Sequence, residues 1–529
     1  MDPARSEDDP FGAGSDPALV IPARIAHWAA VDPDRPFLAE VAGRSVTYGG
    51  FERELRQWCA YLISLGVGPG DRVASFVPAS IDAQLIWLAA ACIGAWEVSV
   101  NPDLRGEMLR HVLSDSAPVH CFARADTAPV ARGSGIDVPV TVVERDGSSV
   151  RGVAPVAELP LPSPADVCCV IYTSGTTGPS KGAVIPWAQL SSIIGRIPRS
   201  WFSSADAVYA PLPMFHVTGR TPTLTMADVG GRVVFRERLS VGEFWSDIRS
   251  HGCTSSTIAS AALLLAQPPR SDDRDNPLRI GLFGALGPTA LEFARRFDVR
   301  ITGNYGSTEI GFPFVNRDVR AETAHLAGWL RPGYEARVVG PSGEVLPAGS
   351  VGELYVKPPD PSLMTRGYLN RPDATARAIS DGWYRTGDAA ILHADSSLQF
   401  VDRLADTLRR FGENISSSAL ETSINADVAV LECAVLGVPS AIAGHEVLLV
   451  VRPVDRASFS AVELFDRLVA VVPKHCLPAY VAVRHDEFPK TPNGKIRKVE
   501  LGSEIARVGG DDVWMSPVAV AARARPSGG

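Results

Sequence analysis

The most constraining feature of the sequence is a loop of hydroxyl and glycine residues that follows an apolar strand and ends in one lysine. The apolar run covers Val167–Tyr172, and the loop continues through residues 173–180 to Lys181. Glycines let the backbone approach a ligand closely, hydroxyls and exposed N–H groups donate to phosphate oxygens, and the lysine adds positive charge. The segment is not a Walker A loop, because Ser180 and Gly182 replace the Gly and the Ser or Thr that flank the lysine there. The residues alone leave two interpretations open, a polyphosphate-binding loop and a flexible surface loop.

Length and composition limit the class of protein. At 529 residues the chain exceeds what one hydrophobic core supports, so we expect two or more domains. The net charge is −8, whereas a nucleic-acid-binding surface needs concentrated positive charge. The eight cysteines include no C-x2-C pair and no cluster with His at zinc-ligand spacing, and this usage is typical of a reducing cytoplasm. We therefore expect a cytoplasmic protein that binds no nucleic acid.

Hydrophobic patterns predict an α/β architecture in the first half of the chain. Helical spacing covers Phe51–Leu65 and Ile81–Cys92. Short apolar runs at Arg72–Val77 and Glu97–Val100 predict strands between and after these helices. Such alternation is typical of a mostly parallel sheet covered by helices. The longest apolar run, Leu85–Trp96, is shorter than the ~20 residues that a bilayer crossing needs, so we expect no membrane insertion.

The pattern changes after residue 328. Short strands separated by turns that contain glycine and proline extend from Gly328 to Asp402. A smaller unit then begins, with strands predicted at 435–438, 445–454 and 480–483 and a helix near 460–472. The last residues are rich in Ala, Arg, Pro, Ser and Gly, a composition that predicts disorder.

Other segments carry residue types that suit nucleotide chemistry. Asn304–Glu309 follows an apolar stretch and offers an aromatic plane for a base, a hydroxyl for a phosphate oxygen and a carboxylate for a hard cation. The alternative is a strand-to-turn junction with a surface Glu. Taken alone, Asp402-Arg403 indicates a surface ion pair of little energetic value. Phe488–Lys498 by composition is a basic, solvated loop, and Lys490 and Lys498 in it are expected to be surface charges.

Residues 172–182 read Tyr-Thr-Ser-Gly-Thr-Thr-Gly-Pro-Ser-Lys-Gly and resemble the signature loop of the adenylate-forming superfamily. This superfamily includes acyl-CoA synthetases, adenylation domains and firefly luciferase. The other motifs occur in the family's order over residues 20–505. The resemblance implies an α/β fold with a large N-terminal domain of helix-covered sheets, a small β-barrel-like subdomain and a small mobile α+β C-terminal domain. The expected boundaries are 17–402 for the adenylation core with its ATP and acyl pockets, 403–507 for the C-terminal lid and 508–529 for a disordered tail.

The resemblance also implies an ATP site with Mg²⁺. In it Tyr305 stacks on adenine, Thr308 contacts the α-phosphate and Glu309 holds Mg²⁺. Asp388, in the segment Gly-Trp-Tyr-Arg-Thr-Gly-Asp, accepts hydrogen bonds from the ribose hydroxyls, and Arg403 contacts ribose and phosphate. The expected ATP-binding set is Thr173, Ser174, Gly175, Thr176, Thr177, Lys181, Gly284, Ala285, Asn304, Tyr305, Gly306, Ser307, Asp388 and Arg403.

Catalysis and acid binding are assigned by the same resemblance. Lys495 bridges the substrate carboxylate and the α-phosphate, where its charge stabilises the negative charge that develops. The expected catalytic residues are Lys495, Thr308 and Glu309. His216 corresponds to an aromatic position near the acyl group, and a satisfied loop histidine is the alternative. Arg220 is either a contact for a second anionic or polar group of the substrate or a surface arginine. The expected acyl pocket comprises His216, Thr218, Arg220, Ile310 and Gly311.

A hinge and a thiol tunnel complete the expected site. Asp406 matches the hinge position at which the C-terminal domain rotates between the two half-reactions. Gly412 leaves room for a pantetheine arm. The sequence departs from the family by placing Phe411 where a second glycine is common. The segment from Phe411 to Ser416 resembles carnitine- and crotonobetaine-type CoA ligases most.

These motifs predict an AMP-forming acid ligase that uses Mg²⁺ as a cofactor and ATP and CoA as co-substrates. A small carboxylic acid is expected to become acyl-AMP and then an acyl-CoA thioester. Other members pass the acyl group to a carrier protein or an amine, or activate nitrite for diazotisation, and the Ala-, Arg-, Gly- and Pro-rich sequence suits bacterial secondary metabolism. A non-catalytic nucleotide-binding relative is the alternative of another class.

Overall fold

The computed structural model describes residues 20–173, 180–258, 261–284, 286–404, 408–410, 413–415, 417–440, 444–472, 476–490, 496–508 and 513–515. The chain forms two compact units. The first contains the residues up to Arg337 together with Tyr355–Thr386 and His393–Gln399. The second contains Val338–Leu354, Gly387–Leu392 and the residues from Phe400 onward. The functional domain boundaries expected above stay a prediction.

The first unit contains a sheet built mainly from parallel strands, with the order β6-β5-β3-β4-β7-β8. Its strands are β3 (Arg72–Phe76), β4 (Trp96–Ser99), β5 (His120–Ala123), β6 (Val140–Val142), β7 (Val167–Thr173) and β8 (Lys181–Pro186). Only β7 and β8 pair antiparallel. Helix α4 (Ile81–Cys92) connects β3 to β4, and all its residues are buried. This burial explains why the helix is apolar on every side except at Asp82 and Gln84. The predicted β-α-β order of this region is confirmed.

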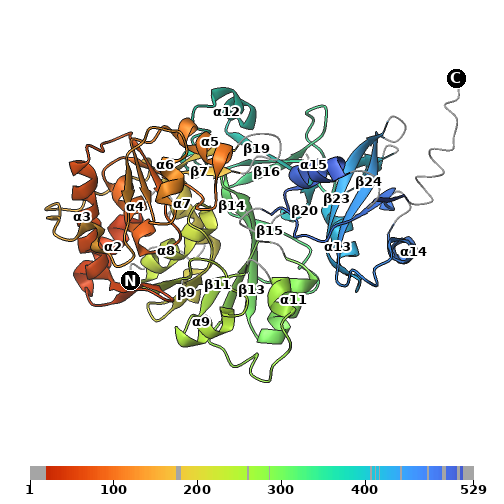
Figure 1. Ribbon diagram of the computed structural model, residues 1–529, viewed down its shortest axis with the longest axis horizontal. Coiled ribbons are helices and arrows are strands. Elements are labelled where there is room, and N and C mark those ends of the chain that lie inside the picture. The colour runs from red at the N-terminus through yellow and green to blue at the C-terminus, as the bar shows by residue number, and fades with distance from the viewer. Residues whose placement is uncertain are drawn as a thin grey trace. The chain divides into compact units, whose positions relative to one another are not determined.

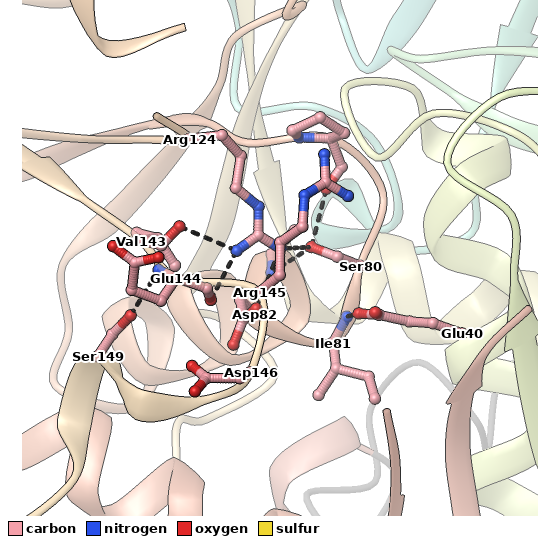
Figure 2. Close-up of polar contacts among 12 residues, drawn as sticks. Glu40, Ser80, Ile81, Asp82, Arg124, Val143, Glu144, Arg145, Asp146 and Ser149 are labelled. Carbon is pink, nitrogen blue, oxygen red and sulfur yellow. Dashed lines mark hydrogen bonds and ion pairs between the residues drawn. The ribbon is translucent and has the colours of Figure 1, made fainter. Parts of the chain in front are cut away.

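A buried ion network holds the amino end of α4. Asp82, in the first turn, accepts hydrogen bonds from Arg44 at 2.8 Å and from Arg124 at 3.0 Å. Arg124 also donates to the Ser80 hydroxyl and to the carbonyl oxygens of residues 143 and 144 (Figure 2). A carboxylate at a helix amino end is favourable, and here it also pairs with two arginines, of which Arg44 has Glu54 as a second partner. The network therefore ties α4 to the loop that follows β5.

The larger sheet of the first unit runs in the order β20-β15-β14-β13-β12-β11-β9-β10-β1-β2. Its strands are β1 (Pro36–Glu40), β2 (Ser45–Thr47), β9 (Ala207–Ala210), β10 (Arg232–Phe235), β11 (Ser255–Thr257), β12 (Ile280–Phe283), β13 (Arg300–Ser307), β14 (Gly311–Asn316), β15 (Gly328–Leu330) and the start of β20 (Ser397–Arg403). Strands β13 to β1 are parallel neighbours, and β14 and β15 add antiparallel strands beside β13 (Figure 1). Parallel strands bring their carboxyl ends to one edge, where such sheets usually bind ligands.

Helices cover both sheets of the first unit. They are α2 (Ile21–Val31), α3 (Tyr48–Ser64), α4, α5 (Gly106–Ser116), α6 (Ala128–Arg132), α7 (Trp187–Ser192), α8 (Val217–Val229), α9 (Phe244–Ser250), α10 (Ala261–Leu265), α11 (Pro288–Phe297) and α12 (Pro372–Ala378). Further strands are β16 (Glu335–Val339), β17 (Val351–Lys357), β18 (Ile379–Ser380) and β19 (Trp383–Leu392), and the barrel-like arrangement expected for this region stays a prediction. Within the described ranges, no helix combines the length and hydropathy that crossing a membrane requires.

The second unit is a smaller α+β structure. Its sheet runs β22-β21-β24-β25-β26, and β23 also pairs with β24. The strands are β21 (Leu408–Arg410), β22 (Glu413–Ile415), β23 (Val430–Ser440), β24 (Gly444–Pro453), β25 (Tyr480–Val483) and β26 (Val513–Met515), and the helices are α13 (Ser417–Ile424), α14 (Ala461–Val471) and α15 (Lys498–Val508). The three predicted strands and the helix near 460–472 are confirmed. The expected mixed α/β fold, with a large N-terminal and a small C-terminal part, is confirmed as well.

Candidate active site

The predicted phosphate loop begins and ends on a pair of hydrogen-bonded strands. Thr173 is the last residue of β7 and pairs in register with Lys181, the first residue of β8. The Thr173 hydroxyl donates to the Lys181 carbonyl oxygen at 3.4 Å. The expected phosphate-binding residues Ser174, Gly175, Thr176 and Thr177 lie outside the described residues. The pairing of β7 and β8 therefore determines where the loop starts and where its lysine emerges.

A tyrosine that the sequence reasoning missed connects two predicted ATP-site residues. The ammonium of Lys181 lies 4.7 Å from the centroid of the Tyr368 ring, a cation–π distance. The Tyr368 hydroxyl donates to a carboxylate oxygen of Glu309 at 2.9 Å. Tyr368 follows Thr365-Arg366-Gly367 and forms an isolated β-bridge with Ala183. In the sequence, only its aromatic ring beside a glycine could have drawn attention to it. One side chain thus brings the expected phosphate lysine and the expected metal ligand together.

The segment Asn304–Glu309 ends β13 and turns into β14. Across the turn Ser307 pairs with Gly311, and a Cβ at Gly306 would lie 1.8 Å from the Gly311 carbonyl oxygen. Only glycine fits at residue 306, so the turn is tight at that point. The Thr308 carbonyl oxygen accepts a hydrogen bond from Gln189 at 2.7 Å. The turn therefore holds Thr308 and Glu309 at the carboxyl edge of the sheet. Because Glu309 is buried, the alternative interpretation of this segment as a strand-to-turn junction with a surface Glu is wrong.

Neighbouring groups complete this edge. Gly284 directly follows β12, and Phe283 of β12 is in register with Gly303 of β13, so Gly284 and Asn304 both follow paired residues at the same edge. Apart from its chain neighbours, no described residue places a heavy atom within 4 Å of a Cβ built on Gly284. Ala285 lies outside the described residues. Tyr305 is buried, with its ring 6.0 Å from that of Phe314 in an edge-to-face contact.

Burial and the nearby carboxylate of Glu309 raise the pKa of Tyr384 well above its ordinary value. Its hydroxyl therefore stays protonated at neutral pH. Tyr384 belongs to β19, in the predicted segment Gly382–Asp388. A neutral phenol beside Glu309 adds no charge to that part of the site.

The expected acyl-pocket residues His216 and Thr218 lie at the amino end of α8. His216 precedes the first residue of the helix, and its backbone N–H donates to the Pro213 carbonyl oxygen at 3.2 Å. A Cβ at Gly219 would lie 2.0 Å from the same carbonyl oxygen, so glycine is required for this close approach. The loop after β9 therefore folds tightly against α8 and directs it from the carboxyl edge of the sheet.

Arg220 is fully buried, so the surface alternative for this residue is wrong. Its guanidinium pairs with Glu97 at 2.7 Å and donates to the Met214 carbonyl oxygen at 3.0 Å. It also lies 4.3 Å from the ring centroid of Trp87. Burial raises the pKa of Glu97, although Arg220 opposes this shift. The pair is neutral overall, and the role of Arg220 as a substrate contact stays a prediction.

Ile310 and Gly311 lie where β14 begins. Ile310 is fully buried, and Gly311 has a φ of +67°, a conformation that favours glycine. The Cγ1 of Ile193, on a short 3₁₀ helix (Ile193–Arg196), lies 3.9 Å from a Cβ built on Gly311. The segment at 193–196 therefore packs beneath this part of the predicted acyl pocket.

In the second unit the two predicted ribose residues form an ion pair. Nε of Arg403 lies 2.8 Å from Oδ1 of Asp388, which is buried. The local sequence suggests a surface ion pair between Arg403 and the neighbouring Asp402, but Asp402 lies in the interior, and its Oδ1 accepts a hydrogen bond from the Arg403 backbone N–H at 2.8 Å. It is buried and accepts hydrogen bonds from the Ser417 hydroxyl at 2.9 Å and from the Ser418 backbone N–H at 3.2 Å. Asp402 therefore caps the amino end of α13.

The expected surface charge at Lys498 is also wrong. Its ammonium pairs with Glu421 at 2.8 Å and donates to the Ser417 hydroxyl at 2.6 Å, and its side chain is only 16% exposed. The first residue of α15 is thus tied to α13. Lys490 fits the expectation better, because its side chain is 38% exposed and pairs with Glu432. The expected catalytic Lys495, hinge residue Asp406 and tunnel residue Gly412, with the departure at Phe411, lie outside the described residues.

The donor set at Glu309 determines what metal it could hold. Among the described residues, no group of three or more His, Cys, Asp or Glu side chains is placed to hold a metal ion. A single carboxylate is the arrangement that suits Mg²⁺, which is usually held by one or two carboxylates together with substrate phosphates. Glu309 is therefore compatible with Mg²⁺ that arrives with ATP.

Two family models match the chain. The AMP-binding enzyme model matches residues 25–369, and the model of the AMP-binding enzyme C-terminal domain matches residues 419–495. The first match includes Lys181, Glu309 and Tyr368, and the second ends at Lys495. Together the two matches cover most of both units.

Curated relatives match over nearly their whole length. Sulfoacetate–CoA ligase of Cupriavidus necator is 28% identical over 94% of this chain and 99% of its own. Feruloyl-CoA synthase of an Amycolatopsis species is 30% identical over 87% of this chain and 94% of its own. Among solved structures, ATP-bound MatB from Rhodopseudomonas palustris has a TM-score of 0.82 at 24% identity, covering 93% of this chain and 99% of that one. At that identity the structural likeness shows the fold.

Proposed function

The chain belongs to the AMP-binding enzyme family, and from this premise we propose that it activates a small carboxylic acid with ATP and transfers the acyl group to CoA. It is an AMP-forming acid ligase, and the resemblance to the adenylate-forming superfamily is confirmed. One observation carries the CoA-dependent reaction: the relatives that match most of the chain are themselves acid–CoA ligases.

The proposed reaction has two steps. In the first, an oxygen of the acid carboxylate bonds to the α-phosphorus of ATP, the bond to the bridging oxygen breaks, and pyrophosphate leaves. In the second, the CoA sulfur bonds to the acyl carbon of acyl-AMP, the bond from this carbon to the phosphate oxygen breaks, and AMP leaves. The thiol proton passes to solvent.

We propose that Glu309, Tyr368 and Lys181 form the phosphate side of the site. Tyr368 supports this assignment because it holds the Glu309 carboxylate at 2.9 Å and lies under the Lys181 ammonium at 4.7 Å. Mg²⁺ bound by Glu309 would neutralise charge on the ATP phosphates. Thr308, from the same turn, would donate to the α-phosphate. The loop residues 174–177 and the backbone at 284–285 would contribute further contacts to ATP.

We assign the ribose to Asp388 and Arg403. A carboxylate can accept from both ribose hydroxyls at once, and the ion pair with Arg403 orients it for this task. Tyr305 would provide the plane for adenine. Lys495 would stabilise the charge that develops as the acid attacks phosphorus, and its removal is expected to lower the rate about 100- to 1000-fold. Asp406 and Gly412 keep their assigned roles at the hinge and the thiol tunnel.

The relatives act on chemically different acids, which include sulfoacetate, crotonobetaine and ferulate by their names. The residues of the acyl pocket, rather than membership of the family, therefore determine which acid this enzyme activates. A carrier-protein thiol is the alternative acceptor. Cysteine usage supports a cytoplasmic enzyme, and the composition supports a role in bacterial secondary metabolism.

The test uses the full chain with ATP, Mg²⁺ and a panel of acids. Acid-dependent exchange of labelled pyrophosphate into ATP is expected for at least one acid. With that acid, CoA, a carrier protein and an amine are then compared as acceptors, and a thioester of CoA is the expected product. If no acid supports exchange, the adenylation step is refuted. If acyl-AMP forms but only another acceptor takes the acyl group, the CoA step is refuted.

A further inference from the structure

Arg196 is a buried arginine whose charge has no counter-ion. Its side chain is 6% exposed, at the end of the 3₁₀ helix beneath the predicted acyl pocket. Among the described residues, none accepts a hydrogen bond from its guanidinium or forms an ion pair with it, and the guanidinium lies 5.1 Å from the centroid of the Phe312 ring. Burial, with help from the neighbouring Arg331, lowers the pKa of Arg196 to about 10. A buried guanidinium charge costs free energy unless an anionic group pairs with it.

Arg196 lines two small cavities. Both are lined by Arg196, Ile197, Phe202 and Thr225. Asp228 lines the first, but its carboxylate already pairs with Arg24 at 3.2 Å and Arg199 at 3.3 Å. The second cavity lies between α8 and the sheet, and its further lining residues are Val208, Thr221, Pro222, Ser255, Thr257 and Leu282.

The second cavity holds another unsatisfied donor. Ser255 is fully buried, and its hydroxyl has no hydrogen-bond partner among the described residues. A buried hydroxyl without a partner costs free energy in the same way as a buried charge, though less. Arg196 and Ser255 come from different elements, and both can donate. Two donors without acceptors around one cavity indicate a ligand that carries acceptors, such as a carboxylate or another anionic oxygen group.

The position of the cavity relates it to the acid site. Ser255 and Thr257 are two residues apart on β11, so their side chains share one face of the sheet and lead toward its carboxyl edge. Helix α8 starts at that edge with Val217, and Thr218, Thr221 and Thr225 follow along it. At 1.5 Å per residue, Thr221 lies about 4.5 Å and Thr225 about 10 Å along the helix from Thr218. Thr221 and Thr225, which line the second cavity, therefore follow the predicted acyl-pocket residue Thr218 along the same helix.

We propose that Arg196 and Ser255 bind a second anionic group at the far end of the acid substrate. This inference rests on the proposed function and narrows its substrate to acids with two negative charges, separated by a chain that spans about 4.5 to 10 Å along α8. Arg220 stays a predicted substrate contact, but unlike Arg196 it already has a carboxylate partner, Glu97. The guanidinium of Arg196 matches a carboxylate through two parallel hydrogen bonds.

The test compares α,ω-dicarboxylic acids of four to ten carbons with monocarboxylic acids of the same length, using acid-dependent pyrophosphate exchange. The native enzyme is expected to prefer the dicarboxylic acid at one or two chain lengths. Arg196→Met should lower kcat/KM for that acid roughly 10- to 100-fold and leave the monocarboxylic acid unchanged or improved. Ser255→Ala should lower it about 2- to 10-fold. Arg320→Met, which removes an exposed arginine elsewhere in the first unit, is the charge control.

Thermal unfolding separates a binding role from a structural one. Because Arg196 lacks a counter-ion, Arg196→Met should keep or raise the Tm of the free enzyme, and the preferred dicarboxylic acid should raise the Tm of the native enzyme but not of the variant. An equal loss of activity toward both acid classes, or a lower Tm in Arg196→Met, would overturn the proposal. So would the absence of any preference for a second carboxylate. If no acid supports exchange, the adenylation proposal fails, while the acid-dependent Tm shift still decides the role of Arg196.

Discussion

Nε of Arg403 lies 2.8 Å from Oδ1 of Asp388, so the two residues expected to contact the ribose already contact each other. The backbone supports this pair, since the Leu404 N–H donates to the Gly387 carbonyl oxygen at 3.0 Å. The guanidinium therefore holds the carboxylate in one orientation before a nucleotide binds. Pre-orientation of this kind reduces the entropy that binding would otherwise lose.

Asp388→Asn should weaken ATP use, because an amide offers one acceptor oxygen where the carboxylate offers two and loses the ion pair with Arg403. We expect kcat/KM for ATP to fall roughly 10- to 100-fold in pyrophosphate exchange. Asp381→Asn is the matched control: Asp381 is exposed at a turn with a φ of +52°, which Asn also adopts. Equal activity of Asp388→Asn and Asp381→Asn would contradict the ribose assignment.

Tyr368→Phe should lower activity by removing the hydroxyl that orients Glu309, while the ring under Lys181 stays. A loss of about tenfold in kcat/KM is expected, with a higher Mg²⁺ concentration needed for half-maximal rate. Tyr368→Leu removes the ring as well and should lose more. Tyr355→Phe, a change to a tyrosine whose ring is packed by Arg337 and Arg385, is the control. An unchanged Mg²⁺ requirement in Tyr368→Phe would argue against the role of Glu309 as a metal ligand.

Asp82→Ala should destabilise the first unit strongly. It removes the shared partner of Arg44 and Arg124, and Arg124 is itself buried. Breaking a buried ion pair by removing one partner typically costs about 3–5 kcal/mol. The free energy of unfolding in urea measures this loss. Glu107→Gln, which breaks the exposed pair with Arg110, should change it little, and similar effects of the two substitutions would refute the importance of the buried network.

Lys498→Met should loosen the contact between α13 and α15 in the second unit. The substitution removes the ion pair with Glu421 and the hydrogen bond to Ser417. A destabilisation of about 1–3 kcal/mol is expected and can be followed by limited proteolysis and thermal unfolding. Lys490→Met removes a lysine from a more exposed pair and should have a smaller effect. If both variants were equally stable, Lys498 would be an ordinary surface charge after all.

The stability of the first unit should depend on pH through His120. Burial lowers the pKa of His120, whose ring nitrogen lies 2.8 Å from the Thr141 hydroxyl. In the unfolded chain the imidazole takes up a proton near its ordinary pKa of 6.5, whereas in the folded chain it does so only at lower pH. The free energy of unfolding therefore falls as the pH drops from 6.5 through the lowered pKa. His120→Gln should flatten this part of the urea midpoint profile. The control His485→Gln, at an exposed histidine, should keep the pH dependence of the native protein. A steeper loss of stability toward low pH in His120→Gln would contradict the predicted direction of the effect.

Much of the fold follows from local pattern. The run at Ile81–Cys92 is apolar except for Asp82 and Gln84 and lies between two short β-rich segments. It predicts a buried helix between parallel strands, because a helix with apolar residues on all sides is buried. The tight turn at Asn304–Glu309 follows from its glycine and its position after an apolar strand. Local pattern failed at Arg220 and Lys498, since long polar side chains are usually exposed and the sequence does not reveal a distant partner.

The sequence by itself determined the class of the protein, through the order of its motifs and the chemistry of Lys181, Glu309 and Asp388. The tertiary structure alone decided which side chains meet: Tyr368 with Glu309, 59 residues apart, and Arg220 with Glu97, 123 residues apart. It also decided that Arg196 is buried with no ion-pair partner among the described residues. The physical reason is that a buried charge depends on contacts made across the fold, and these contacts are set by the packing of helices on sheets rather than by neighbours in the chain.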